Sequence, residues 1–239
     1  MNKACKLARY LLALYARSSR FIMQATALIM FVAVLYATAP ADVVSDFSLS
    51  AVVVFFLMAW AGFGMPDPLM EQLLLLKAGS AARLRLGEAL ALLALGAMGS
   101  AVSVLYPVVV NLFMGGHLFK SPLTAENVFL GFALSAAAGF SGGITGWFFH
   151  PRVVEDRKLA ALLTLLVPVL GLAKPGLSSL WPPLGVLGWL LPPLADAALR
   201  LSGKEAFVPG DVLLSAGGLI LYGGAMGLVR HAILERRKY

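Results

Sequence analysis

The sequence is poor in charged residues and in cysteine. Only 13% of its 239 residues are Asp, Glu, Lys or Arg, and 60% are hydrophobic, whereas an ordinary soluble domain carries about 25% charged residues. Too few charged side chains remain to cover a water-soluble particle, which excludes a cytosolic enzyme and a secreted scaffold. The single cysteine, Cys5, excludes an internal disulfide and a cysteine-based metal cluster. The composition predicts an all-α, polytopic membrane helix bundle, and no metal site.

Long apolar segments define the expected spans. Six of them are rich in Leu, Ala, Val, Phe and Met, and each is long enough as a helix to cross a hydrocarbon core of about 30 Å. A seventh contains two Pro-Pro pairs, which remove too many backbone donors for one lipid-exposed helix. We interpret it as a re-entrant hairpin before the last span. The six spans are expected at 21–41, 47–66, 89–120, 127–152, 159–174 and 212–229, and the hairpin at 174–195.

The basic residues orient these spans. The net charge of +7 would suggest nucleic-acid binding on a soluble fold, but here the basic residues are spread among the loops. Lys and Arg are retained on the cytoplasmic side of membrane proteins. With both termini cytoplasmic, all but four of the 19 Lys and Arg residues lie inside; the four are Lys120, Lys174, Arg200 and Lys204. We therefore predict a multi-pass cell-membrane protein with both termini cytoplasmic and no nucleic-acid partner.

The first twenty residues form an amphipathic pattern. Leu7, Leu11 and Leu14, with Tyr10 and Tyr15, follow the spacing of one helical face, and basic residues occupy the opposite side. Such a helix lies in the cytoplasmic interface, with its apolar side toward acyl chains and its basic side toward anionic headgroups. It either anchors the topology or also contacts a cytoplasmic partner, and the two roles are compatible.

A second short helix is predicted at 67–79, between the second and third spans. Asp67 suits its N-cap, Pro68 its first turn and Gly79 its end. The helix is too short to cross a membrane, yet it is apolar, so it either docks into a protein groove or rests on the bilayer. We favour docking. The candidate interface residues are Asp67, Leu69, Met70, Glu71, Gln72, Leu73, Leu74 and Lys77.

The turn between the fourth and fifth spans is short and highly charged. Such a run is usually a solvated turn whose ion pairs contribute little. Because it is expected on the cytoplasmic side, it is also a candidate second contact for the same partner. The residues concerned are Arg152, Glu155, Asp156 and Arg157.

Together these segments resemble the membrane subunit of an ABC-2 type ABC transporter. The shared pattern is an amphipathic elbow at 1–20, six spans, a short cytoplasmic helix at 67–79 and a broken hairpin at 174–195. The stretches 71–77 and 149–158 also look like bacterial permeases of this kind. The resemblance covers nearly all of 1–239 as one permease domain. It implies that 67–79 is the coupling helix and that the hairpin forms an extracellular gate, with Trp181, Pro182, Pro183, Trp189, Pro192 and Pro193.

The resemblance implies that two copies of the chain, or this chain and a related permease, form an export pathway. Two cytoplasmic ATPase subunits would bind below and use ATP and Mg²⁺. The chain itself contains no Walker-type phosphate-binding motif, so it is expected to be non-catalytic and to hold no cofactor. Because no charge is expected inside a span, the cargo is predicted to be apolar or amphipathic: a peptide, drug or lipid.

The sequence also leaves other membrane functions open. The nearest alternative is the substrate-binding membrane component of an energy-coupled vitamin importer, which also uses six helices and an ATPase. An intramembrane enzyme or an ion-coupled transporter would need polar or ionisable groups inside the bilayer. The interiors of the expected spans offer uncharged polar side chains such as Asn111, serines and threonines, and the sequence contains no catalytic motif.

Overall fold

The computed structural model describes residues 3–65, 68–180 and 188–236. All regular structure in these residues is helical, apart from an isolated bridge between Ala41 and Phe119. The elements are α1 (Lys3–Ala16), α2 (Ser19–Leu35), α3 (Val43–Gly64), α4 (Pro68–Ala78), α5 (Ala81–Phe113), α6 (Ala125–Phe148), α7 (Arg157–Leu180), η1 (Gly188–Leu190), α9 (Leu194–Leu201) and α10 (Pro209–Arg236).

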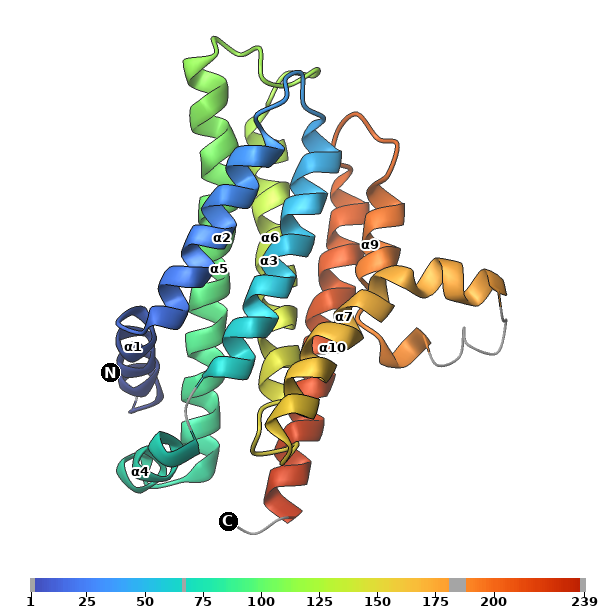
Figure 1. Cartoon of the computed structure of the whole chain (residues 1–239). Helices are drawn as coiled ribbons and strands as arrows, with labels where there is room; N and C mark the ends of the chain where they lie inside the picture. The colour runs from blue at the N-terminus through green and yellow to red at the C-terminus, as the bar shows by residue number, and fades with distance from the viewer. Residues whose placement is uncertain (1–2, 66–67, 181–187, 237–239) are drawn as a thin grey trace.

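The long helices run side by side as a bundle, which confirms the predicted fold class (Figure 1). Among the described residues, five helices are long and apolar enough to cross a membrane: α3, α5, α6, α7 and α10. A sixth span is possible if α1 and α2, which meet at a bend of 77°, count as one broken span. The protein is therefore a multi-pass membrane protein.

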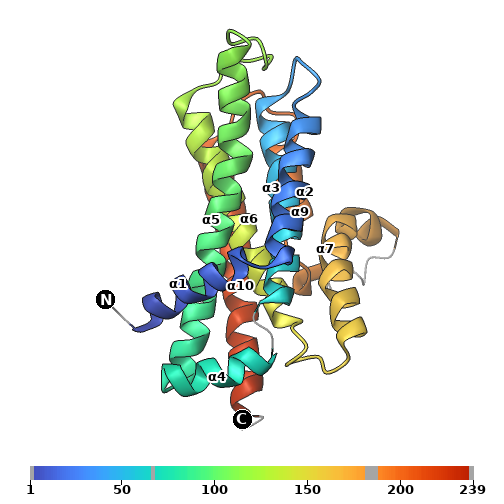
Figure 2. The same cartoon turned by 60° about the vertical axis from the view of Figure 1, so that its left-hand side comes forward.

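Different elements lie at the two ends of the bundle. Both termini, α4 and the 149–156 turn lie toward one end, which we call the α4 end (Figures 1 and 2). The loops 36–42, 114–124 and 202–208 lie at the opposite end, which we call the far end.

Helix α6 forms the centre of the bundle and packs against α3, α5 and α10. Its small residues permit this. A Cβ at Gly142 would overlap the backbone carbonyl of Phe55, and one at Gly146 would overlap that of Ala59. The small-residue spacing at these two glycines therefore marks a close backbone approach between α3 and α6.

Helix α7 departs from the prediction. The fifth span was expected to end at Lys174, where the proline-rich hairpin would begin, but α7 continues through Pro175 to Leu180. It rises along the bundle and turns aside, and α9 continues toward the far end (Figures 1 and 2). The ammonium group of Lys174 lies 2.6 Å from the Asp196 carboxylate and so joins α7 to α9. The fifth long helix thus extends further along the chain than expected.

Helix α1 is also packed differently from the prediction. Its apolar face was expected to point toward acyl chains, but Leu7, Leu11 and Tyr15 are buried, and α1 packs against α5. A Cβ at Gly87 would lie 2.8 Å from a Leu7 methyl group, so this glycine lets α1 approach α5. Only Tyr10 among the aromatic residues of α1 is exposed, together with Leu14.

Candidate functional site

Helix α4 has the predicted bounds and is joined directly to α5. Gly79 has a φ of +72°, the left-handed conformation that glycine adopts at a helix end. The Ser80 hydroxyl then accepts a hydrogen bond from the Arg83 amide at 3.3 Å and caps α5. Because only two residues separate the helices, a displacement of α4 acts directly on the start of α5.

The candidate interface residues of α4 fall into two groups. Leu73 is 64% exposed, whereas Leu74 is 4% exposed and belongs to the core of the chain. Lys77 lies over the Tyr10 ring, 5.5 Å from its centroid. Asp67 and the side chains of Leu69, Met70, Glu71 and Gln72 lie outside the described part of the structure.

Leu76, which the sequence analysis did not select, is 82% exposed. The signal for this distinction is absent from the sequence, because four consecutive leucines at 73–76 do not mark one face. The exposed apolar surface of α4 in the described residues is thus formed by Leu73 and Leu76, and we call it the α4 surface.

The charged turn at the α4 end is partly structural. The Asp156 carboxylate accepts hydrogen bonds from the amides of Lys158 and Leu159, at 2.8 and 3.4 Å, and so caps the start of α7. Glu155 and Arg157 are exposed, and Arg152 is half-buried. The four candidate residues therefore lie on one exposed turn, and one of them also begins a helix.

The predicted gate residues are also divided. Trp189 is 87% exposed on η1. Pro192 is buried and packs against Gly171 of α7, while Pro193 precedes α9. Trp181, Pro182 and Pro183 lie outside the described residues. The described part of the predicted gate thus combines one projecting aromatic side chain with two packed prolines.

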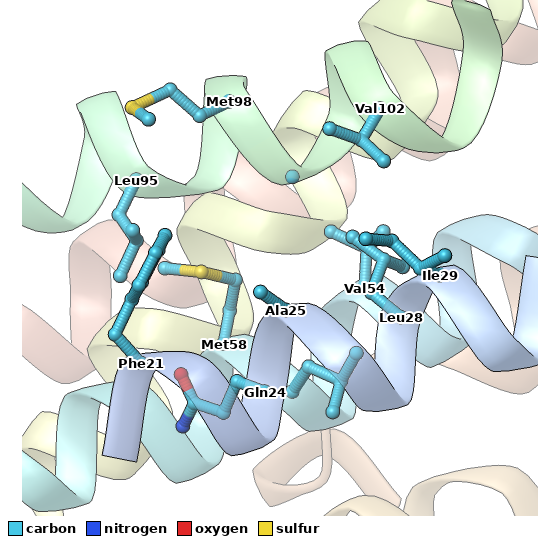
Figure 3. A pocket seen from close by; sticks show the side chains of 12 residues that line it. Phe21, Gln24, Ala25, Leu28, Ile29, Val54, Met58, Leu95, Met98 and Val102 are labelled. Atoms are coloured by element: carbon cyan, nitrogen blue, oxygen red, sulfur yellow. The ribbon is translucent and has the colours of Figure 1, made fainter. Parts of the chain in front are cut away.

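An apolar pocket of about 120 Å³ lies between α2, α3 and α5 (Figure 3). Phe21, Ala25 and Ile29 of α2 face Leu95 and Met98 of α5 across it. The one polar side chain among its lining residues is that of Gln24. The lining residues are Phe21, Gln24, Ala25, Leu28, Ile29, Val54, Leu57, Met58, Leu95, Met98, Gly99 and Val102.

A buried ion pair lies toward the α4 end, and the sequence analysis missed it. Glu88 of α5 and Arg230 of α10 were assigned to cytoplasmic segments, but their side chains are 1% and 0% exposed. Arg230 Nη1 lies 3.9 Å from the Glu88 carboxylate. The expectation that no spanning helix holds a charge is therefore wrong, because α5 and α10 extend past both residues.

Trp147 of α6 completes this group, which we call the Glu88–Trp147–Arg230 cluster. Its indole Nε1 donates a hydrogen bond to Glu88 at 3.0 Å, and its carbonyl oxygen accepts one from Arg230 Nε at 2.9 Å. The guanidinium carbon lies 3.6 Å from the centroid of the indole ring, in the geometry of a cation–π contact. Three helices are thereby joined by one desolvated charged group.

A second polar contact lies one turn nearer the α4 end. Arg85 of α5 hydrogen-bonds the His231 ring, and it donates to the His231 carbonyl oxygen at 3.2 Å. His231 in turn lies 3.1 Å from the Glu235 carboxylate. Together with the buried cluster, these contacts fix α10 to α5 along two successive turns.

The comparisons with known proteins give no family. No family model, curated protein or solved structure matches the chain. Within the described residues, no group of three or more His, Cys, Asp and Glu side chains is placed to hold a metal ion. The features of the described residues that bear on function are the α4 surface, the apolar pocket and the buried cluster.

Proposed function

We propose that the chain is the membrane permease subunit of an ATP-driven exporter of the ABC-2 type. The observation that carries the proposal is α4: a short helix at the end of the bundle where both termini lie, with Leu73 and Leu76 exposed and only two residues between it and α5. An apolar helix face of this kind is suited to a protein groove. The groove would belong to a cytoplasmic ATPase subunit.

The energy for transport would come from that partner. The chain has no Walker-type motif, so ATP and Mg²⁺ would be bound by the ATPase. Closure of two ATPase subunits would move α4, and α5 would carry the motion into the bundle because its cap follows α4 directly. The permease would then alternate between inward-facing and outward-facing states.

Charge and pocket chemistry support the proposed direction and cargo. The excess of Lys and Arg in the segments at the α4 end favours a cytoplasmic position for that end by the positive-inside rule. The pocket between α2, α3 and α5 is apolar and opens beside Met98, which is 55% exposed. It suits an apolar or amphipathic cargo that enters from the bilayer. A second copy of the chain or a related permease would complete the pathway.

The α4 surface provides the test. The chain is affinity-purified from its native membrane, and the ATP hydrolysis that co-purifies is measured while the bound ATPase is identified by mass spectrometry. We expect Leu73→Asp with Leu76→Asp to remove at least nine-tenths of this activity, because two buried carboxylates would be unpaired in an apolar groove. Membrane insertion and yield of the chain should not change.

The matched control is Leu112→Asp, which changes an exposed leucine near the far end. It should retain the ATPase, because a cytoplasmic partner does not reach that end. Normal recovery of the ATPase with the double variant would refute the docking role of α4. ATP-dependent uptake of a cargo into cells, in place of efflux, would refute the proposed direction.

A further inference from the structure

A groove lies between α1 and α4 and is separate from the α4 surface. Its volume is about 450 Å³, and it is lined by Lys6, Leu7, Tyr10, Leu74, Lys77 and Ala78. Three of these side chains are buried and apolar: Leu7, Leu74 and Ala78. The other three, Lys6, Tyr10 and Lys77, are exposed. The groove thus has an apolar floor and a mouth with two ammonium groups.

The position of the groove in the bundle limits what can fill it. Helix α1 lies across the bundle at the foot of α2, and α4 lies beyond it toward the end of the bundle (Figure 2). The chain bends by 77° between α1 and α2. The apolar side of α1 packs against α5, and its exposed side carries Lys6 and Arg9. Basic side chains next to a membrane bundle lie near the anionic headgroups. The groove therefore opens at the depth of the lipid headgroups.

We propose that this groove binds the headgroup and upper acyl region of one anionic phospholipid. The phosphate would lie between Lys6 and Lys77, and the apolar part would cover Leu7, Leu74 and Ala78. None of the described lining residues is acidic, so the charge of the mouth is complementary to a phosphate. Tyr10, an amphipathic side chain of the kind enriched at this depth, already holds the Lys77 ammonium near its ring.

The apolar floor distinguishes a lipid from a soluble anion. A free phosphate would satisfy the two lysines but would leave the leucines facing water, whereas a phospholipid covers both. The inference requires only that the bundle lies in a membrane. It does not depend on transport or on an ATPase. A failure of the lipid proposal would therefore leave the proposed function standing, and a failure of the proposed function would leave the lipid proposal standing.

The single cysteine provides the measurement. Cys5 is exposed and lies on α1 beside Lys6, but it does not line the groove. The purified full chain is labelled with a fluorophore at Cys5 and placed in phosphatidylcholine nanodiscs. A rising fraction of the lipid is then replaced by lipid that carries a nitroxide near its headgroup, and the quenching of the fluorophore by the nitroxide is recorded. Phosphatidylglycerol and phosphatidylcholine are compared in this way.

We expect phosphatidylglycerol to be preferred by about 30-fold, since each lysine near an anionic surface contributes about fivefold. Lys6→Gln with Lys77→Gln should abolish the preference. Arg9→Gln with Arg17→Gln removes the same charge from two exposed positions outside the groove, one on α1 and one in the turn that follows it, and should retain the preference.

Three outcomes would overturn the proposal. The unchanged chain could show no preference for phosphatidylglycerol, or the two double variants could lose it equally, which would assign it to diffuse surface charge. Displacement of the labelled lipid by inorganic phosphate would assign the site to a free anion.

Discussion

Removing one charge from the Glu88–Trp147–Arg230 cluster should destabilise the bundle strongly. The two charged groups are 1% and 0% exposed and lie 3.9 Å apart. At that distance, with an effective dielectric constant of about 20, their attraction is about 4 kcal/mol. Measured losses when one partner of a buried pair is removed are similar, about 3–5 kcal/mol.

The variants differ in what they leave behind. Glu88→Gln keeps an oxygen that can accept the Trp147 indole hydrogen bond and removes only the charge, so we expect a loss of about 3 kcal/mol in the free energy of unfolding. Arg230→Met also removes the hydrogen bond to the Trp147 carbonyl, so its loss should be about 4–5 kcal/mol.

The double variant is the decisive measurement. Glu88→Gln with Arg230→Met leaves neither charge of the cluster. Its remaining cost is the lost Arg230 hydrogen bond to the Trp147 carbonyl, about 0.5–1.5 kcal/mol, because that carbonyl still accepts from the His150 amide at 3.4 Å. The double variant should therefore lose less stability than the sum of the two single-variant losses. The difference, which is the coupling free energy between the two side chains, should be about 3 kcal/mol or more. Reversible unfolding in mixed micelles, followed by far-ultraviolet circular dichroism, gives all four free energies.

An exposed glutamate provides the control for the buried cluster. Glu126→Gln changes an exposed glutamate at the start of α6 and should alter the stability by less than about 0.5 kcal/mol. If the losses of the two single variants add in the double variant to within about 0.5 kcal/mol, the two charges do not interact, and the cluster is only a packing contact.

Two further predictions concern packing and topology. Gly146→Ala places a methyl group against the Ala59 carbonyl and should cost about 1–3 kcal/mol, whereas Gly217→Ala, with no atom within 4 Å of the added carbon, should be neutral or slightly stabilising in the same unfolding assay. In intact cells, a membrane-impermeant maleimide should label Lys120→Cys in a Cys5→Ser background. Cys5 in the unchanged chain should react only after the cells are permeabilised. The reverse labelling pattern would invert the proposed orientation.

The fold could be predicted from the sequence because long apolar runs and sparse charge leave few alternatives. The short helix at Pro68–Ala78 was predicted with its bounds, since Gly79 marks its end. Which of its leucines is buried could not be predicted, because the run 73–76 has no polar residue to set a phase. That choice depends on packing against α1 and α5.

Charge misled the prediction at two helix ends. Glu88 and Arg230 were treated as boundaries, because a charged residue ordinarily ends an apolar span. However, α5 has 33 residues and α10 has 28, more than the 20 or so that a bilayer requires. The extra turns carry both residues into the bundle, where they face each other across 142 positions of sequence that no local pattern connects.

Proline misled the prediction in the same way. The fifth span was expected to end at Lys174, just before Pro175, yet Pro175 lies inside α7, as Pro168 does. A proline lacks one backbone donor and disturbs the turn before it, but a helix in a membrane protein tolerates this where neighbouring groups satisfy the freed carbonyl. The effect of a proline on a span therefore depends on its surroundings as well as on its presence.

The position of the buried cluster bears on how a push on α4 would travel. Helix α5 begins two residues after α4 and carries Glu88 two turns later. Through Glu88 it is held to Arg230 of α10 and to Trp147 of α6. A displacement of α4 that tilts α5 must therefore either carry α6 and α10 along or break a desolvated ion pair at a cost of about 3–5 kcal/mol. The first course is the less costly, so under the proposed function α5, α6 and α10 would move as one body together with α3, which packs along α6. The change of access would then occur where α2 meets α3 and α5, and where α7 meets α3.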